Sequence, residues 1–341
     1  MVMKMKKIKL ADVAKEAGVS TATVSRVLNN NGYVSNEVRS LVWRAVQSTG
    51  YERGQEPDCS DRQKLVGVIL KKLPVNMFFE TLNYALQDEF EKAGMQSITL
   101  FCDHVNNITV KERAEKLLGF HVCGIIISGF EEDTLTREVR MFLLSCGVPV
   151  VFVERLADSQ GFNQVCVDNT LGGYLAARHL IESGHKKIVY IGRGKLDYHT
   201  GSYRLEGFMK AVREAKEPPE YLVKICSSPN VEEGYHALKE AEQELPGFTG
   251  VQAWYDGYVV GAMRYFYERG IKVPEDVEIV GHDDTYSALL VPPVSSVHLP
   301  FEEMACAAVN VIVHWQDETV EHFVRSIYLE PKLVLRGLDE V

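Results

Sequence analysis

Near the amino end of the chain, three side chains are spaced for reading the edges of DNA base pairs. Thr21 offers a hydroxyl, Ala22 offers a methyl group that can contact the thymine methyl, and Arg26 offers a guanidinium fork that matches guanine O6 and N7. Four nearby polar side chains suit phosphate oxygens, which fix register without reading sequence: Ser20, Thr23, Ser25 and Asn29. Because Arg26 alone could be an ordinary surface arginine, the prediction depends on the helices around it.

Two short helices joined by a tight turn are predicted to position these side chains. The first has apolar residues at the spacing of one helical face, namely Leu10, Val13, Ala14 and Ala17. Gly18 then permits a left-handed turn, and Ser20 can cap the second helix. The inward face of that second helix comprises Ala22 or Thr23, followed by Val24, Val27 and Leu28. This pattern is typical of a helix-turn-helix, whose second helix enters the major groove.

Residues 1–53 complete a small basic domain. A third helix is expected from Ser35 to about Thr49, with an inward face of Val38, Leu41, Val42, Ala45 and Val46. The domain holds nine Lys or Arg and four Asp or Glu, so its formal net charge is +5. Because the whole chain has a net charge of −10, the remaining residues sum to −15. A basic head on an acidic body suits a polyanionic partner, although an ordinary solvated surface also explains such an asymmetry.

These residues resemble the headpiece of the lactose repressor and galactose repressor family of bacterial transcription regulators. The resemblance covers the run LADVAKEAGVSTATVSRVLNN and the following VSNEVRSLVWRAVQSTGY. In that family the two residues after the turn serine and the later arginine read bases, which implies that role for Thr21, Ala22 and Arg26.

The linker over residues 54–64 departs from the family. Its members continue into Arg-Pro-Asn and a hinge helix with a leucine that wedges into the minor groove, whereas this chain reads GQEPDCSDRQK. Gly54 and Pro57 disfavour a helix, and Glu56, Asp58 and Asp61 sit poorly against phosphates. We therefore expect a flexible linker with no inserted apolar wedge, or else a linker that becomes ordered only on operator DNA.

Beyond residue 64, short apolar runs alternate with amphipathic helical stretches. The strand-like runs are 65–70, 96–101, 123–128, 149–153, 164–167, 187–191, 222–226, 251–254 and 277–280. Such alternation predicts an α/β body of parallel sheets with helices on both faces, and so many strands favour two doubly wound lobes. Ligands bind outside the carboxyl ends of such strands, so we expect a site between the lobes.

The family resemblance extends over this body. It rests on NMFF at 76–79, VDN at 167–169, GHKKI at 184–188, RLEGF at 204–208, VPEDV at 273–277 and GHDD at 281–284. It implies a periplasmic-binding-protein-like domain over 65–341 that binds a small effector and forms the dimer. By this analogy lobe 1 comprises about 65–163 and 297–323, lobe 2 comprises 164–296 and 324–341, and the chain crosses near 163, 296 and 323.

Six residues are predicted to bind the effector. Arg204 and Asp283 match the arginine and the acid that the family uses, and a guanidinium can hold hydroxyls, a carboxylate or a phosphate. Glu154 is a further acid at a strand end. Phe78 and Phe79 could stack on a ring, although one of such a pair is often core. Tyr255 stands where relatives often carry asparagine, which bears on the identity of the effector.

No catalytic, metal or cofactor motif competes with this interpretation. The chain lacks GxSxG, HExxH and a complete P-loop, and Gly192-Arg193-Gly194 lacks the third glycine of a dinucleotide fingerprint. His282 and Asp283 are adjacent on a strand and face opposite sides, so no metal is expected. Seven cysteines without a CxxC pair suit reduced thiols, and no apolar run is long enough to span a membrane. We expect a cytoplasmic protein that is neither exported nor an enzyme.

The sequence therefore predicts a homodimeric transcription regulator, a repressor, that binds an inverted-repeat operator and is controlled by a sugar or related metabolite. A competing hypothesis is a solute-binding module or α/β enzyme whose basic head is only a tail. Whether the ligand releases DNA or recruits the protein to it stays open.

Overall fold

The structure is a computed structural model that describes residues 10–28, 36–49, 64–72, 77–132, 134–154, 161–193, 200–315 and 324–337. The chain divides into two compact units, Met1–Arg62 and Gln63–Val341, and each is described by itself. The linker predicted over 54–64 lies outside the described residues except for Lys64, which begins the first strand.

The head unit contains the predicted helix-turn-helix. Helices α1 (Leu10–Ala17), α2 (Thr21–Leu28) and α3 (Asn36–Thr49) share one apolar core, formed by Val13, Ala14, Ala17, Val24, Val27, Val42 and Ala45. Gly18 adopts a φ of +67°, and the N–H of Val19 donates to the Ala14 carbonyl at 3.1 Å, which closes the turn. The expectation that Leu41 faces inward is wrong, because it lies at the edge of the apolar stripe of α3 and is 43% exposed.

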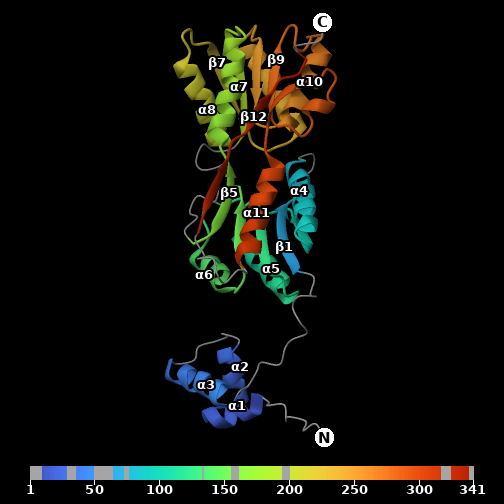
Figure 1. The fold of residues 1–341 in the computed structure, drawn as a ribbon. Coiled ribbons are helices and arrows are strands. Elements are labelled where there is room, and N and C mark those ends of the chain that lie inside the picture. Colours follow the sequence, from blue (N-terminus) through green and yellow to red (C-terminus); the bar gives the residue numbers. More distant parts are fainter. Residues whose placement is uncertain are drawn as a thin grey trace. The chain divides into compact units, whose positions relative to one another are not determined.

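The first sheet of the body is parallel throughout and has the order β11-β5-β4-β3-β1-β2 (Figure 1). Its strands are β1 (Lys64–Lys71), β2 (Met95–Cys102), β3 (Gly124–Ser128), β4 (Val150–Val153), β5 (Asn163–Val167) and β11 (Ser326–Leu329). Side chains alternate between two cores: Val66 and Val68 pack with α4 (Phe78–Lys92) and α11 (Phe301–Trp315), while Ile69 packs with α5 (Asn107–Gly119) and α6 (Arg137–Ser145). Burial on both faces explains the continuous apolar runs in the sequence.

The second sheet has the order β12-β10-β9-β8-β6-β7, and only its β10–β12 pair is antiparallel among the described pairs. Its strands are β6 (Lys187–Arg193), β7 (Glu220–Cys226), β8 (Gly250–Ala253), β9 (Glu278–Asp283), β10 (Ser295–His298) and β12 (Lys332–Val334). Helices α7 (Asn169–Glu182) and α8 (Thr200–Glu214) pack with Tyr190 on one face. Helices α9 (Val231–Glu244) and α10 (Asp256–Arg269) pack with Ile191 on the other. The predicted two doubly wound lobes are confirmed.

The chain passes between the two sheets three times, each time later than the predicted positions 163, 296 and 323. Strand β5 pairs with β4 and β11, so residues up to Val167 and the stretch Ser326–Leu329 belong to the first lobe. Strand β10 pairs with β9, which keeps residues up to His298 in the second lobe. The first and third connections are joined, because the N–H of Asp168 donates to the Leu329 carbonyl at 2.9 Å.

Candidate functional site

The exposed start of α2 is the candidate DNA-binding surface. Ser20 and Thr21 are exposed, and Thr23 is half-buried. The Ser20 hydroxyl accepts a hydrogen bond from the Thr23 N–H at 3.1 Å and lies 2.8 Å from the Thr23 hydroxyl, so it caps the helix as the sequence predicts. Thr21 is left as the exposed hydroxyl of the first turn. The side chains of Ala22, Ser25 and Arg26, and all of Asn29, lie outside the described residues.

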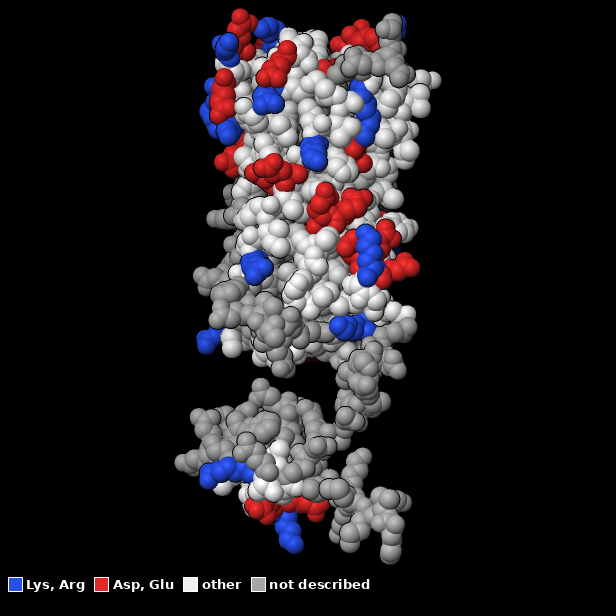
Figure 2. Space-filling view, viewed as in Figure 1, with Lys and Arg blue, Asp and Glu red and all other residues white. Residues whose placement is uncertain are grey.

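The face of the body drawn in Figure 2 carries charges of both signs. On the face seen in Figure 2, acidic side chains are spread over both lobes with basic side chains among them. This distribution matches the net acidity of residues beyond the head, and it leaves the head as the basic part of the chain.

Arg204 is the centre of the candidate effector site. This residue of α8 is 5% exposed, and its guanidinium joins three other elements. Its Nε donates to Asn169 Oδ1 at 2.7 Å, its Nη1 donates to the Trp254 carbonyl, and its Nη2 donates to Asp283 Oδ1 at 3.0 Å. One predicted residue thus holds the start of α7 and the carboxyl ends of β8 and β9 together.

Two acids with unusual backbone conformations accompany it. Glu154, just after β4, has a φ of +78°, and Asp283, at the end of β9, has a φ of +87°. Such left-handed conformations are strained in residues other than glycine and cluster at functional sites. Burial raises the pKa of both carboxyls, and the charge of Arg204 opposes that rise in each. Because Glu154 also feels the charge of Asp283, acids carried by the two different lobes lie within electrostatic reach of each other.

The carboxylate of Glu154 is held by its own lobe. It accepts hydrogen bonds from the Ser128 hydroxyl at 3.2 Å and from the Gly129 N–H at 2.9 Å. Gly129 has a φ of +82°, and a Cβ placed on it would lie 2.8 Å from the ring of Phe79. Phe79 therefore borders the peptide that orients Glu154.

The two predicted phenylalanines have different surroundings. Phe78 packs its ring 5.1 Å from Phe79 and 5.3 Å from Phe301, measured between centroids. Both residues belong to the core beneath α4 and α11. Phe78 is thus a core residue held between two rings, as the alternative interpretation of the pair anticipated, and Phe79 stays a candidate because it touches Gly129.

Tyr255 belongs to an aromatic cluster at the end of β8. Its ring lies 5.3 Å from Trp254 and 4.5 Å from Tyr258, and it covers Gly257. Two guanidinium groups also lie over the Trp254 ring. The guanidinium carbon of Arg204 is 5.3 Å from the ring centroid, and that of Arg193 is 5.6 Å from it. Arg193 was not predicted as a site residue. The signal in the sequence was its place at the end of an apolar run, the position where ligands of such sheets bind.

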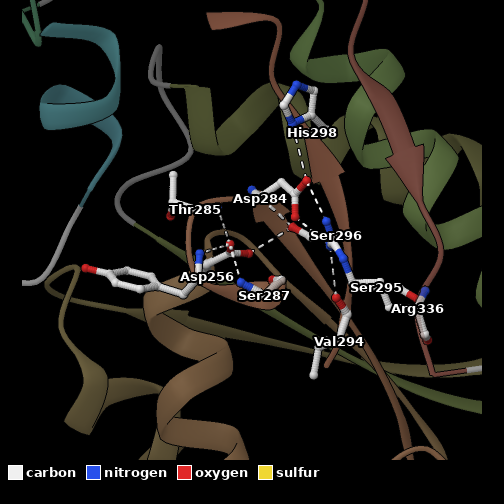
Figure 3. A network of polar contacts seen from close by, with 10 residues as sticks. Asp256, Asp284, Thr285, Ser287, Val294, Ser295, Ser296, His298 and Arg336 are labelled. Carbon is white, nitrogen blue, oxygen red and sulfur yellow. Dashed lines mark hydrogen bonds and ion pairs between the residues drawn. The ribbon is translucent and has the colours of Figure 1, made fainter. Parts of the chain in front are cut away.

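A second polar network supports the strand end that carries Asp283. The buried carboxylate of Asp256 accepts hydrogen bonds from the Thr285 N–H at 2.7 Å, the Tyr286 N–H at 3.0 Å and the Ser296 hydroxyl at 2.9 Å (Figure 3). Burial raises the pKa of Asp256 to about 6. This carboxylate fixes the loop that follows β9, and hence the backbone of Asp283.

Asp284 extends the network to the connections between the lobes. Its carboxylate binds both terminal nitrogens of Arg336 and lies 3.2 Å from His298 Nδ1 (Figure 3). His298 is the last residue of β10, and Arg336 follows β12. The strand end that carries the candidate effector acid is therefore tied to segments beside two of the three crossings.

The described residues were also searched for a metal site and for a membrane-spanning helix. No group of three His, Cys, Asp or Glu suited to a metal ion occurs in the described ranges. His282 is buried, its ring packs against Gly172, and burial lowers its pKa well below the usual value. None of the helices in the described part of the chain has the length and apolar character needed to cross a membrane.

Both the head and the body of the chain are similar to known protein families. Residues 9–53 match bacterial regulatory proteins of the lacI family, and residues 177–337 match a periplasmic binding protein-like domain. The HTH-type transcriptional repressor PurR of Salmonella arizonae is 31% identical over 350 residues, which cover 96% of this chain and 95% of that protein.

Solved structures show the same architecture. A complex of the transcriptional regulator CelR with cellobiose has a TM-score of 0.69 and 28% identity, covering 96% of this chain and 99% of that one. The lac repressor dimer bound to operator and the anti-inducer ONPF has a TM-score of 0.67 at 24% identity, covering 97% and 98% of the two chains. At that identity the second likeness shows the fold alone.

Proposed function

The chain belongs to the lacI family of bacterial regulatory proteins, and from that membership we infer that it is a sequence-specific DNA-binding transcriptional repressor controlled by a small-molecule effector. Its relatives are DNA-binding regulators rather than enzymes. The head supplies the DNA-binding helix α2, and the body supplies the effector site.

We propose that the effector binds where the carboxyl ends of the strands of both lobes face each other. The observation that carries this proposal is the Arg204 guanidinium, which is buried and joins Asn169, the Trp254 carbonyl and Asp283. Glu154 approaches from the other lobe and shares their electrostatic environment. A ligand with several hydroxyls can accept from the guanidinium and donate to the two carboxylates at once.

The protein is proposed to act as a homodimer on an inverted-repeat operator. Two heads joined through their bodies bind two half-sites, and the second binding event is intramolecular, which raises the overall affinity. The effector then regulates by linkage, because it changes operator affinity only to the extent that it prefers one arrangement of the lobes.

Two measurements test this function. A gel shift with operator obtained by selection from random DNA, run at low and high salt, should show steep loss of binding with salt, since phosphate contacts release counterions. Lack of DNA affinity even at low salt would favour the solute-binding or enzymatic alternative. A thermal-shift screen over sugars, sugar phosphates, nucleobases and amino acids should find a ligand that raises the melting temperature, because it binds only the native state.

A further inference from the structure

At Trp254 and beside it, three hydrogen-bond donors have no partner among the described residues. The guanidinium of Arg193 lies 5.6 Å from the centre of that ring, and no hydrogen bond or ion pair of Arg193 occurs with any described residue. The Nε1 of Trp254 and the hydroxyl of Tyr255 are buried and also lack a partner within the described ranges. Buried polar groups without partners are costly, so this concentration of donors calls for a complementary group.

Arg193 differs in this respect from the other cations at the site. Arg204 is paired with Asp283 at 3.0 Å, and the buried Lys71 at the end of β1 is paired with Glu131. Both of those charges are neutralised within the protein. Arg193, which is half-buried, faces an aromatic ring and has no acid beside it in the described structure. Among the described residues, the region around Trp254 therefore carries one positive charge without a paired acid.

The chemistry of the three groups selects an acceptor. Guanidinium and indole N–H groups only donate hydrogen bonds, and a neutral phenol can donate. Burial and the charge of Asp283 raise the pKa of Tyr255, which keeps its hydroxyl protonated. A group rich in acceptor oxygens and negatively charged would satisfy all three, and the guanidinium would bind a carboxylate or a phosphate by charge-assisted hydrogen bonds.

The two acids of the site have the opposite chemistry. Asp283 uses Oδ1 for Arg204, and Glu154 uses Oε2 for Ser128 and Gly129. The remaining carboxylate oxygens accept hydrogen bonds and repel an anion. A ligand that suits both kinds of group therefore presents hydroxyls to these acids and an anionic group to Arg193.

We propose that the effector is a polyhydroxylated anion, a sugar acid or a sugar phosphate, whose anionic group binds Arg193 together with Trp254 Nε1 and the Tyr255 hydroxyl. This inference rests on the proposed function only in taking the Arg204–Asp283 region as the effector site. The carboxylate and the phosphate share the chemistry that Arg193 recognises, and the experiment separates them.

The test compares anionic ligands with their neutral counterparts on the full-length chain. The probes are glucose, gluconate, glucuronate, glucose 6-phosphate, ribose and ribose 5-phosphate at millimolar concentration, measured first by thermal shift and then by calorimetry. We expect at least one anionic probe to bind more tightly than its neutral counterpart. Arg193→Gln should weaken that probe roughly 10- to 100-fold, the value of a lost charge-assisted bond, and Arg193→Lys should restore part of the loss.

Arg264→Gln is the matched control. Arg264 lies 4.9 Å from the ring of Tyr235 and is half-exposed. It therefore makes the same kind of guanidinium–aromatic contact as Arg193, but it is not part of the candidate effector site. The proposal is overturned if no anionic probe binds, if a neutral sugar binds as well as its anionic counterpart, or if Arg193→Gln leaves affinity unchanged. If a neutral sugar binds and Asp283→Asn abolishes that binding, the proposed anionic effector is wrong and the proposed effector site is retained. If the unaltered protein does not bind DNA, the proposed function itself is contradicted.

Discussion

The carboxylate of Asp283 lies 3.0 Å from the guanidinium of Arg204, and each side chain is only 6% exposed. Because removing both charges from water is costly, such a pair persists only with good geometry and further hydrogen bonds. Asn169 and the Trp254 carbonyl provide those bonds to the guanidinium. The pair joins α8 to the ends of two strands, and in the proposed function it lies within the effector site.

Breaking this pair should destabilise the body. Arg204→Met leaves the buried Asp283 without its cation, and we expect the free energy of unfolding to fall by about 3–5 kcal/mol. Urea unfolding followed by circular dichroism measures the change. Arg264→Met removes an exposed arginine that pairs with Glu232 and Glu268, and it should change stability by no more than about 1 kcal/mol. Equal stability of the two variants would show that the buried pair does not hold the strand ends.

Asp256 should make stability depend on pH. Burial raises its pKa to about 6 in the folded protein, whereas an unfolded Asp titrates near about 3.9. Between these values the unfolded chain has released its proton and the folded protein has not, so stability falls as the pH rises through this window. The unaltered protein should therefore lose stability relative to Asp256→Asn from about pH 4 to about pH 6 and stay level above it. Urea unfolding of both proteins across this range tests it, and a constant difference would contradict it.

Two adjacent residues of the head should separate folding from DNA binding. Ser20 caps α2 by accepting the Thr23 N–H, so Ser20→Ala should cost about 1 kcal/mol of head stability. Thr21 is exposed, so Thr21→Ala should leave the melting temperature of the head unchanged and weaken binding to the selected operator. Calorimetric melting and gel shift on both variants test the pair. A Thr21→Ala protein with full operator affinity would remove this residue from the proposed contact surface.

Periodicity predicted the elements because burial imposes it directly on the sequence. The apolar stripe of α1 and the continuous runs of β1 and β9 follow from one buried helical face and two buried sheet faces. The lobe to which a strand belongs has no such local signal. Residues 164–167 were assigned to the second lobe, yet β5 pairs with β4 and β11, and those pairings depend on segments far away in the chain.

Individual site residues could be predicted from the sequence, but the contacts between residues far apart in the chain could not. Arg204 and Asp283 were found from the family resemblance, and their mutual bond was not. Arg193 was missed because its significance depends on Trp254, which follows far along the chain, and on the lack of an acid nearby in the described structure. Asp256 was not predicted as a site residue, because its network with Ser296 and the loop after β9 depends on the folded arrangement.

The close packing of α7 on α8 should also be sensitive to substitution. A Cβ placed on Gly173 would lie 2.0 Å from the backbone carbonyl oxygen of Arg204, and one on Gly207 would lie 2.0 Å from that of Thr170. Backbone atoms cannot move aside as a flexible side chain does, so Gly173→Ala must separate the two helices. We expect a loss of roughly 1–3 kcal/mol or more in the free energy of unfolding, together with weaker effector binding because Arg204 is displaced.

Gly119→Ala provides the comparison for this substitution. Gly119 ends α5, and a Cβ there would meet nothing within 4 Å, so alanine should leave stability unchanged or slightly raise it. Urea unfolding of both variants, with calorimetry for the effector found in the ligand screen, gives the two readouts. If Gly173→Ala unfolded at the same urea concentration as Gly119→Ala, the contact between α7 and α8 would have to be looser than the structure shows, and Arg204 would owe its position to the strand ends alone.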